Sequence, residues 1–172
     1  IEVCLVGSEM CIRDREIGAS ELAFMLKDID NSSGIGTSVP ILDPERNIAL
    51  YRALTNAMEN NLIRSAHDCS DGGLSVSLAE SCFGFSGGAD IDVSEILLSD
   101  DELDEWGALF GESLGRIIVS VSPENATEFE ERMEGHAVYK LGKTTSSGKV
   151  MISAHGKTIL TVSYTHLRAH ET

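Results

Sequence analysis

The alternation of two hydrophobic periods along the chain constrains its fold more than any other sequence feature. The longest helical pattern begins where Asp43 precedes Pro44, the usual order of a helix cap and a first helical residue. The pattern ends near the pair Asn60 and Asn61. Between these points, apolar residues recur every three or four positions, namely Ile48, Tyr51, Leu54, Met58 and Leu62. This spacing predicts a helix from residue 44 to about residue 60.

Three further segments have helical spacing, and they are residues 18–29, 72–83 and 123–135. The first carries Leu22, Met25, Leu26 and Ile29. The second is expected to face the core with Leu74, Leu78, Ala79 and Cys82. The third opens at Ser122 and Pro123 and is expected to close at Gly135, in keeping with the preferences of helix ends.

Strand patterns lie between the helical segments. Residues 115–122, with the sequence GRIIVSVS, form the most strand-like run of the chain. Residues 89–93 alternate, with Ala89, Ile91 and Val93 on one face. Other strand candidates are residues 62–67, 137–142, 149–154 and 157–162, the last two joined around His155 and Gly156. Helices that alternate with strands and end in a hairpin predict an α/β or α+β layer fold, with helices flanking a mixed sheet.

Composition limits the classes of protein to which this chain can belong. Its 172 residues, 42% of them hydrophobic, suffice for one domain with a single core. With 13 basic against 28 acidic residues, the net charge of −15 argues against a nucleic-acid partner. The apolar runs are shorter than the about 20 residues needed to cross a bilayer, so we expect no membrane association. The four cysteines fit neither a zinc spacing nor a disulfide framework, which favours a cytoplasmic protein.

The two ends of the chain differ in character from its body. The opening IEVCLVGSEMCIRDR and the closing VSYTHLRAHET resemble translated sequencing-adapter sequence. We therefore expect residues 1–15 and 163–172 to be non-native and the domain itself to span residues 16–162. The absence of an apolar period in residues 164–172 agrees with this interpretation.

The segment SAHDCSDGGLSVSLAE, residues 65–80, runs from a strand through a turn into a helix. Gly72 and Gly73 fall where the helix begins, so we expect unblocked amides and the positive end of the helix dipole to face outward. Such a helix start binds phosphate, which makes both glycines candidate nucleotide-binding residues. Asp68 would repel a bare phosphate, but a bridging Mg²⁺ removes the conflict, and the Ser70 hydroxyl could donate to a phosphate oxygen. The turn is not a P-loop, because a leucine follows the second glycine.

The residues of this turn also have structural interpretations. Asp71 is a favoured residue type for a helix N-cap, and paired glycines often serve a tight turn. His67 fits a strand-end histidine bonded to the backbone. Cys69 fits a small core residue, because no neighbour in the sequence would lower its pKa. The local sequence leaves the phosphate site and the simple capped helix both open.

A second polar turn, LFGESLGR at residues 109–116, leads into the strongest strand. Gly111 and Gly115 allow close backbone approach, and a polar turn before a buried strand is a common place for ligand contacts. Under the alternative interpretation, Glu112 and Arg116 form a surface ion pair of small energetic value.

Together, these motifs resemble a known family. HDCSDGGLSVSLAE, GADIDV and LFGESLGRIIVSVSPENA are similar to the last domain of the large subunit of phosphoribosylformylglycinamidine synthase, and GASELA resembles the GGSEY helix of that family. The resemblance covers nearly all of the body and implies a fold like the C-terminal domain of AIR synthase. It also implies an ATP-dependent ligase of purine biosynthesis. In that reaction ATP activates the amide oxygen of formylglycinamide ribonucleotide, and ammonia derived from glutamine then displaces the phosphate.

The resemblance assigns roles to four residues. Asp68 matches an aspartate that ligates Mg²⁺ bridging to nucleotide phosphates, and Ser70 matches a serine near the nucleotide. Glu112 and Ser113 match, by internal pseudo-symmetry, a pair that contacts substrate. The implied cofactors are therefore ATP and Mg²⁺. The turn resembles the copy associated with an auxiliary nucleotide site, so we expect no catalytic residue in this chain.

The resemblance extends to only one module of a larger subunit. The implied partners are the amino-terminal modules of the same subunit, a glutaminase subunit and a small bridging subunit. We expect the chain to be inactive without those modules and to expose apolar residues on the face that meets them. The alternative is a non-catalytic structural or interaction module whose turn no longer binds nucleotide.

Overall fold

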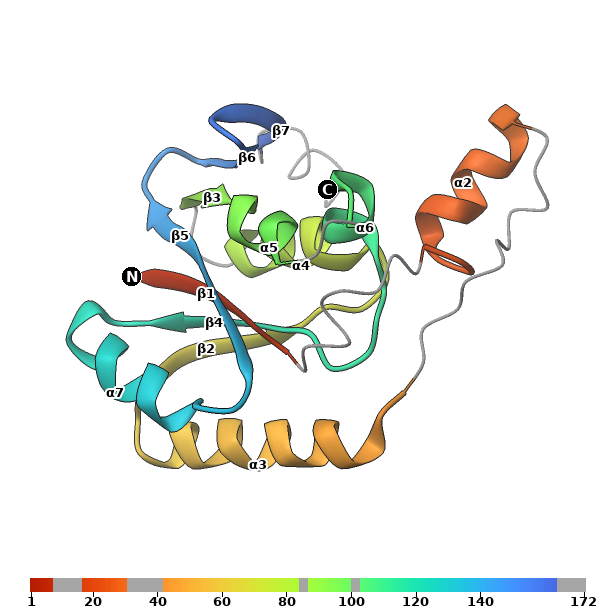
Figure 1. Ribbon diagram of the computed structural model, residues 1–172. Coiled ribbons are helices and arrows are strands. Elements are labelled where there is room, and N and C mark those ends of the chain that lie inside the picture. The colour runs from red at the N-terminus through yellow and green to blue at the C-terminus, as the bar shows by residue number, and fades with distance from the viewer. Residues whose placement is uncertain (8–16, 31–41, 84–86, 100–102, 164–172) are drawn as a thin grey trace, which may run out of the picture.

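A mixed seven-stranded sheet forms the centre of the protein (Figure 1). The computed structural model describes residues 1–7, 17–30, 42–83, 87–99 and 103–163. The strand order is β2-β4-β1-β5-β3-β6-β7, and every neighbouring pair is antiparallel except β3 and β6, which are parallel. The strands are β1 (Glu2–Gly7), β2 (Ile63–Asp68), β3 (Gly88–Asp92), β4 (Ile117–Val121), β5 (Ala137–Thr145), β6 (Lys149–Ala154) and β7 (Lys157–Ser163).

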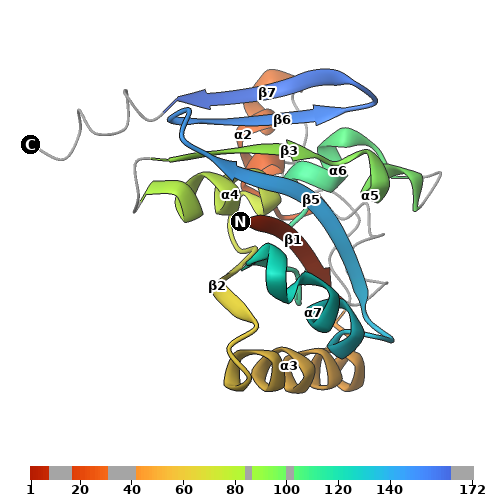
Figure 2. The ribbon, with the colours of Figure 1, turned by 90° about the vertical axis from the view of Figure 1, so that its left-hand side faces the viewer.

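Helices cover both faces of this sheet (Figures 1 and 2). One face packs against α4, α5 and α6, and the other packs against α3 and α7, which confirms the predicted layer fold with a mixed sheet. In the described part of the chain, no helix is long and apolar enough to span a bilayer. The helices are α2 (Glu21–Asp30), α3 (Pro44–Glu59), α4 (Gly73–Phe83), α5 (Ser94–Leu98), α6 (Glu105–Phe110) and α7 (Ala126–Arg132).

The core consists of two clusters of buried apolar side chains, one on each side of the sheet. The larger cluster joins α4, α5 and α6 to the sheet and contains Leu74, Leu78 and Cys82 of α4, with the predicted inward residues of β3. Ala79, the fourth predicted inward residue of α4, is also buried. The smaller cluster joins α3 and α7 to β1 and β4 through Leu50, Leu54 and Phe129. The two predicted faces of α4 and β3 are therefore confirmed.

Strand β1 departs from the expected domain boundary at residue 16. Glu2–Gly7 lies between β4 and β5 in the sheet, with Val3 and Leu5 in one core cluster and Cys4 and Val6 in the other. An apolar run buried on both faces suits a central strand. The expected boundary rested on the resemblance to adapter text and not on this pattern, so it excluded a segment that the sheet contains. The non-native origin of the two ends stays a prediction, and residues 8–15 and 164–172 lie outside the described residues.

Helix α3 confirms the predicted helix but buries a different face. Its buried residues are Asn47, Leu50, Leu54 and Ala57. Of the five residues in the predicted apolar period, Leu54 and Leu62 are buried, whereas Ile48, Tyr51 and Met58 are exposed. The Asp43 side chain caps the helix by accepting from the Arg46 amide at 3.1 Å, as the sequence predicts. The helix therefore carries apolar side chains on two sides.

The remaining elements differ from the predictions mainly at their ends. The segment 123–135 forms a 3₁₀ turn, Pro123–Asn125, followed by α7, which ends three residues before Gly135. At the last hairpin His155 and Gly156 have φ values of 49° and 75°. Positive φ at both positions is typical of a two-residue hairpin turn, and this confirms the predicted connection between β6 and β7.

Candidate functional site

The two polar turns meet around a cavity of about 510 Å³. They meet because β2 and β4 are antiparallel neighbours in which Asp68 pairs with Ile117. The turn that follows β2 and the turn that precedes β4 therefore meet at the same end of the sheet. The lining residues are Tyr51, Asp68, Cys69, Ser70, Asp71, Glu112, Leu114, Gly115, Arg116 and Ile117. Three predicted site residues, Asp68, Ser70 and Glu112, line this cavity.

The first turn presents side-chain oxygens to the cavity. Asp68 is exposed at the end of β2, and its Oδ2 accepts a hydrogen bond of 2.5 Å from the Ser70 hydroxyl. This bond, with a further bond from the backbone, holds the pKa of the Asp68 carboxyl below its ordinary value. Asp68 is therefore ionised at neutral pH. Ser70, which the sequence assigned to a phosphate, donates to Asp68 in this structure.

The oxygens around this cavity suit a Mg²⁺ ion that is also bound by phosphate. The lining includes the carboxylates of Asp68, Asp71 and Glu112, and Mg²⁺ prefers oxygen ligands. No group of three or more His, Cys, Asp or Glu residues in the described ranges is arranged to hold a metal by itself. Mg²⁺ usually keeps one or two carboxylates and completes its shell with water and substrate phosphates. The residues therefore fit a Mg²⁺ that arrives with a phosphorylated ligand.

The two glycines of the first turn make contacts within the protein and do not form an open phosphate-binding site. The Gly72 amide donates to Glu112 Oε1 at 2.8 Å, and the Gly73 amide donates to the Ser70 carbonyl at 3.0 Å. The prediction that these amides face outward is therefore wrong. Both residues have positive φ, and a Cβ at Gly73 would lie 2.7 Å from the Gly111 carbonyl oxygen. The turn needs glycine because the two polar turns touch at this point.

Glu112 links three parts of the chain through one carboxylate oxygen. Its Oε1 accepts from the Gly72 amide at 2.8 Å and from the Glu21 amide at 2.9 Å. Glu21 begins α2, and Gly72 directly precedes α4, so both donors lie at helix starts, where a carboxylate is favoured by the helix dipole. The sequence offered Asp71 as the cap of α4, whereas the carboxylate bound at this turn is that of Glu112. Glu112 therefore holds α2 and the first turn together.

The second turn is built around a buried arginine. Arg116 is 2% exposed, and its guanidinium donates to the carbonyls of Gly111 at 2.9 Å and Ala108 at 2.7 Å. These carbonyls belong to the end of α6, so Arg116 satisfies the last carbonyls of that helix. A surface ion pair with Glu112 is excluded because the arginine is buried. Ser113 is also buried, at 1% exposed, and lies outside the lining of the cavity, so its predicted contact with substrate stays a prediction.

His67 and Cys69 follow their structural interpretations. The Nδ1 of His67 lies 2.7 Å from the Asp68 carbonyl, and its Nε2 lies 3.4 Å from Glu80 Oε2. Cys69 is buried, and burial raises the pKa of its thiol. A buried thiol with a raised pKa is a poor nucleophile, so Cys69 serves the core.

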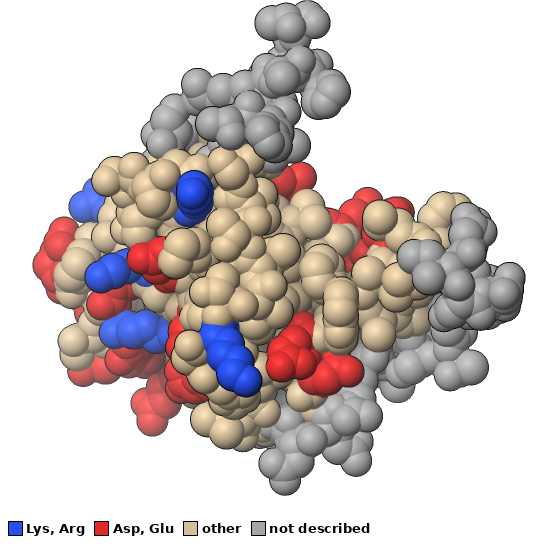
Figure 3. All heavy atoms as spheres, turned by 90° about the horizontal axis from the view of Figure 1, so that it is seen from above, with Lys and Arg blue, Asp and Glu red and all other residues tan. Residues whose placement is uncertain are grey.

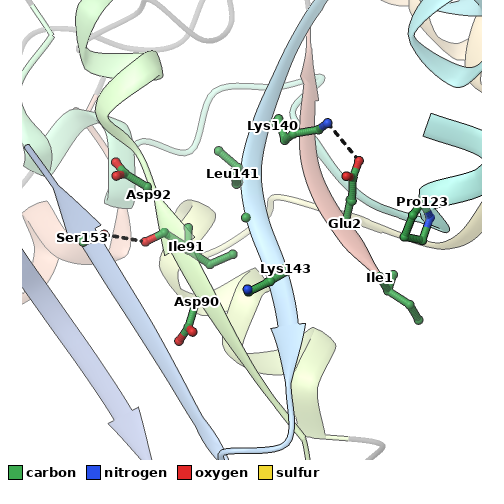
Figure 4. A pocket seen from close by; sticks show the side chains of 11 residues that line it. Ile1, Glu2, Asp90, Ile91, Asp92, Pro123, Lys140, Leu141, Lys143 and Ser153 are labelled. Atoms are coloured by element: carbon green, nitrogen blue, oxygen red, sulfur yellow. Dashed lines mark hydrogen bonds and ion pairs between the residues drawn. The ribbon is translucent and has the colours of Figure 1, made fainter. Parts of the chain in front are cut away.

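A second, larger cavity of about 600 Å³ lies where β1, β3 and β5 run side by side (Figure 4). Lys140, Lys143, Asp90 and Asp92 project around it (Figure 4). Several of its polar groups are already engaged, because Lys140 Nζ lies 3.1 Å from Glu2 Oε2 and Ser153 donates to the Ile91 carbonyl at 3.0 Å. None of the predicted site residues lines it. We therefore base the candidate site on the cavity at Asp68.

Acidic and basic side chains are interspersed on the molecular face seen in Figure 3. On that face, lysine and arginine do not gather into one patch, and acidic residues lie among them (Figure 3).

The cavity at Asp68 is locally acidic, since three acidic residues line it and its one arginine is committed to backbone carbonyls. A free anion would be repelled there, whereas an anion carrying a divalent cation would be attracted.

Tyr51 and Leu114 line the cavity, but they were not predicted as site residues. The sequence assigned Tyr51 to the apolar period of α3. Because α3 has apolar residues on two sides, spacing alone does not show which side is buried. Leu114 lies inside the second polar turn, and its exposure was the missing signal.

A protein-family model covers most of the chain. Residues 2–154 match the family described as AIR synthase related protein, C-terminal domain. The match begins at residue 2 and therefore includes β1.

Two curated relatives with similar sequences share the name phosphoribosylformylglycinamidine synthase subunit PurL. The protein from Limosilactobacillus reuteri is 37% identical over 151 residues, which is 88% of this chain and 18% of the relative. The protein from Carboxydothermus hydrogenoformans is 35% identical over 133 residues, which is 76% of this chain and 17% of the relative. The chain thus spans less than one fifth of the length of these relatives.

Solved structures with the same fold include PurL of Thermotoga maritima. The structure titled as its complex with FGAR matches 96% of this chain and 27% of that chain, with a TM-score of 0.75 and 17% identity. The structure titled as its complex with ATP matches 94% of this chain and 24% of that chain, with a TM-score of 0.70 and 17% identity. At this identity the match shows the fold.

Proposed function

Since this chain belongs to the family of AIR synthase related protein C-terminal domains, we propose that the cavity at Asp68 is one wall of a Mg²⁺–ATP site in a phosphoribosylformylglycinamidine synthase. The observation that carries the proposal is the meeting of Asp68, Ser70 and Glu112, from two separate motifs, around one cavity. The names of the curated relatives and the ATP complex of the Thermotoga maritima protein support it.

In this proposal Asp68 is the residue that holds Mg²⁺. Its exposed, ionised carboxylate offers an oxygen, and Asp71 lies in the same lining. The bound ion would neutralise the phosphate charge that the three carboxylates of the cavity otherwise repel. Ser70 orients the Asp68 carboxylate and lowers its pKa through its 2.5 Å hydrogen bond.

The proposed whole protein is a cytoplasmic ATP-dependent ligase of purine biosynthesis. Formylglycinamide ribonucleotide, ATP and ammonia would give formylglycinamidine ribonucleotide, ADP and phosphate. The domain supplies one wall of a nucleotide site and no catalytic residue, so the isolated chain is inactive. The remaining walls and the ammonia come from amino-terminal modules of the same subunit and from a glutaminase, with a small bridging subunit. A structure titled PurLQS from Thermotoga maritima supports a multi-subunit assembly.

A second candidate function is a non-catalytic interaction module. One observation favours it, since the amides of Gly72 and Gly73 are engaged within the protein and leave no open seat for a bare phosphate. The two functions make different demands on Asp68. A nucleotide site requires its carboxylate, whereas a purely structural module does not, because this side chain is exposed at the end of an edge strand.

The test is a titration of Mg²⁺–ATP into the full-length polypeptide that carries this domain, followed by calorimetry. Asp68→Asn should weaken the affinity about tenfold or more, because it removes a charged ligand of the ion. Asp90→Asn is the matched control, since Asp90 is an exposed aspartate that lines the larger cavity. Equal affinities for Asp68→Asn and the unaltered protein would reject the nucleotide site and favour the interaction module. A loss confined to Asp90→Asn would move the site to the other cavity.

A further inference from the structure

Helix α3 has an apolar stripe on the side that faces away from the sheet. Ile48, Tyr51 and Met58 are 50%, 45% and 43% exposed, and Thr55 lies between the last two. Their spacing of three, four and three residues puts these four side chains, here called the outer stripe, in one row along the helix. The opposite side of α3 is buried against the sheet. A helix with apolar residues on both sides is typical of an element packed between two surfaces.

The outer stripe is continuous with the candidate site. A shallow cavity of about 370 Å³ runs along it, lined by Ile48, Tyr51, Arg52, Thr55, Asn56 and Glu59. Tyr51 also lines the cavity that contains Asp68. A surface that covered the stripe would therefore reach the rim of the candidate site.

The length of the relatives indicates what covers the stripe. More than four fifths of each curated relative described above lies outside the region that this chain matches. A nucleotide site with only one wall also needs a second surface beside it. Arg52 borders the stripe and pairs with no acid among the residues that the structure describes, so its guanidinium can donate to a carboxylate of that surface.

We infer that the outer stripe of α3 is the docking surface for another module of the same polypeptide, and that this module closes the candidate site at Tyr51. The covering segment is apolar opposite Ile48 and Met58 and carries an acidic residue opposite Arg52. This inference rests on the proposed function, which requires a second wall. It adds which face of the domain receives that wall and which residue joins the two.

Oxidation of methionine tests the inference directly, because Met58 lies in the stripe and the rate of its oxidation follows its exposure. Met151 on β6 is the matched control, since it is 40% exposed against 43% for Met58. Hydroxyl-radical footprinting with mass spectrometry is applied to the 172-residue chain and to the full-length polypeptide that carries it. The Met58 rate should fall about tenfold in the longer protein. An unchanged Met58 rate would overturn the inference.

A substitution in the stripe provides the second readout. Ile48→Asp in the full-length polypeptide should return the Met58 rate to that of the 172-residue chain, whereas Ile159→Asp, at a 40% exposed site on β7, should leave Met58 protected. Protection of Met58 that survives Ile48→Asp would contradict docking on this stripe. Protection that appears in the 172-residue chain alone and rises with its concentration would assign the stripe to a second copy and overturn the inference.

The outcomes also separate this inference from the proposed function. If Met58 is protected but Asp68→Asn leaves the Mg²⁺–ATP affinity unchanged, the docking surface stands and the nucleotide site fails. If Asp68→Asn weakens the affinity while Met58 oxidises at the same rate in both proteins, the nucleotide site stands and the docking surface fails.

Discussion

The two turns that border the candidate cavity contain similar residues but do different work. The turn from Asp68 to Gly73 leaves Asp68, Ser70 and Asp71 exposed. The turn from Gly111 to Arg116 buries its serine and its arginine, and it spends its hydrogen bonds on backbone groups of α6 and of the first turn. The first turn presents chemistry and the second holds it in place.

This difference shows how polar, glycine-rich text should be interpreted. Both turns combine glycine with acidic and hydroxyl residues, and the sequence therefore predicted ligand contacts for both. Their burial separates them, because the buried Arg116 guanidinium is committed to the carbonyls of Gly111 and Ala108, whereas the polar side chains of the first turn stay exposed. Substitutions of polar side chains in the second turn should therefore reduce stability, whereas substitutions of the exposed polar side chains in the first turn should change charge and binding.

The largest expected effect comes from Arg116→Ala. It removes two charge-assisted hydrogen bonds to helix carbonyls and leaves a cavity, so the free energy of unfolding should fall by about 3 to 5 kcal/mol. Chemical denaturation measures it. Arg64→Ala is the control, because Arg64 is exposed and lies 3.7 Å from Glu124, and it should change stability by about 0.5 kcal/mol or less. Equal effects of the two substitutions would break the comparison between the turns.

Gly73→Ala should have the next largest effect. Its φ of +63° is costly for alanine, and its Cβ would lie 2.7 Å from the Gly111 carbonyl oxygen and 2.9 Å from the Phe110 carbonyl carbon. A loss of about 2 to 4 kcal/mol combines these two costs. Gly148→Ala isolates the first cost, because Gly148 has a φ of +67° and no heavy atom within 4 Å of its Cβ position. It should lose only about 1 to 2 kcal/mol, and an equal loss at both sites would show that the two turns do not pack tightly.

Glu112→Ala should weaken the link between the turns and α2. Two amide donors lose their acceptor, so stability should fall by about 1 to 3 kcal/mol. Glu112→Gln keeps an acceptor oxygen and should lose less. The specific readout is hydrogen exchange at the Glu21 and Gly72 amides, which should speed up in the alanine variant. Unchanged exchange at both amides would show that Glu112 does not hold these segments.

The fold was predictable wherever one face of an element is apolar and the other is polar. Strand β3 satisfies this condition, and its buried residues Ala89 and Ile91 were predicted. The four predicted residues of α4 are buried, but Ser75 and Ser77 are buried as well and were not predicted. Helix α3 does not satisfy the condition, since Ile48 on the outside is as apolar as Leu50 on the inside. Strand β1 was not predicted for another reason. Its resemblance to adapter sequence led us to exclude it, although its apolar run is buried on both faces of the sheet.

The candidate site was predictable in its residues but not in its bonds. Asp68 and Glu112 were both predicted, because strand ends and polar turns are common places for such groups. The bond from the Gly72 amide to Glu112 spans 40 residues, and the bond from the Glu21 amide spans 91. Such contacts depend on strand order, which local spacing does not determine. The same limit hid Tyr51, whose place in the cavity follows from the packing of α3 on the sheet.

The smallest expected effect on stability belongs to the first turn, at Ser70→Ala. The Ser70 hydroxyl is the main cause of the lowered pKa of Asp68, so its loss should raise that pKa toward the ordinary value of an aspartate. A lowered folded-state pKa stabilises the protein above the ordinary pKa, and this contribution disappears as the pH falls through the lowered value. The variant should therefore be slightly less stable than the unaltered protein at neutral pH, and the difference should disappear in acid. A ¹³C NMR titration of the side-chain carboxyl groups measures the change in the pKa of Asp68.

Asp92 supplies the matched control for this titration, because the Ser94 hydroxyl lowers its pKa in the same way. Ser94→Ala should raise the pKa of Asp92 and leave that of Asp68 unchanged, and Ser70→Ala should do the reverse. If Ser70→Ala moves neither carboxyl but destabilises the protein at neutral pH, then the first turn also serves architecture. In that case the contrast between the first turn, which exposes polar groups, and the second turn, which holds them in place, would fail at Ser70.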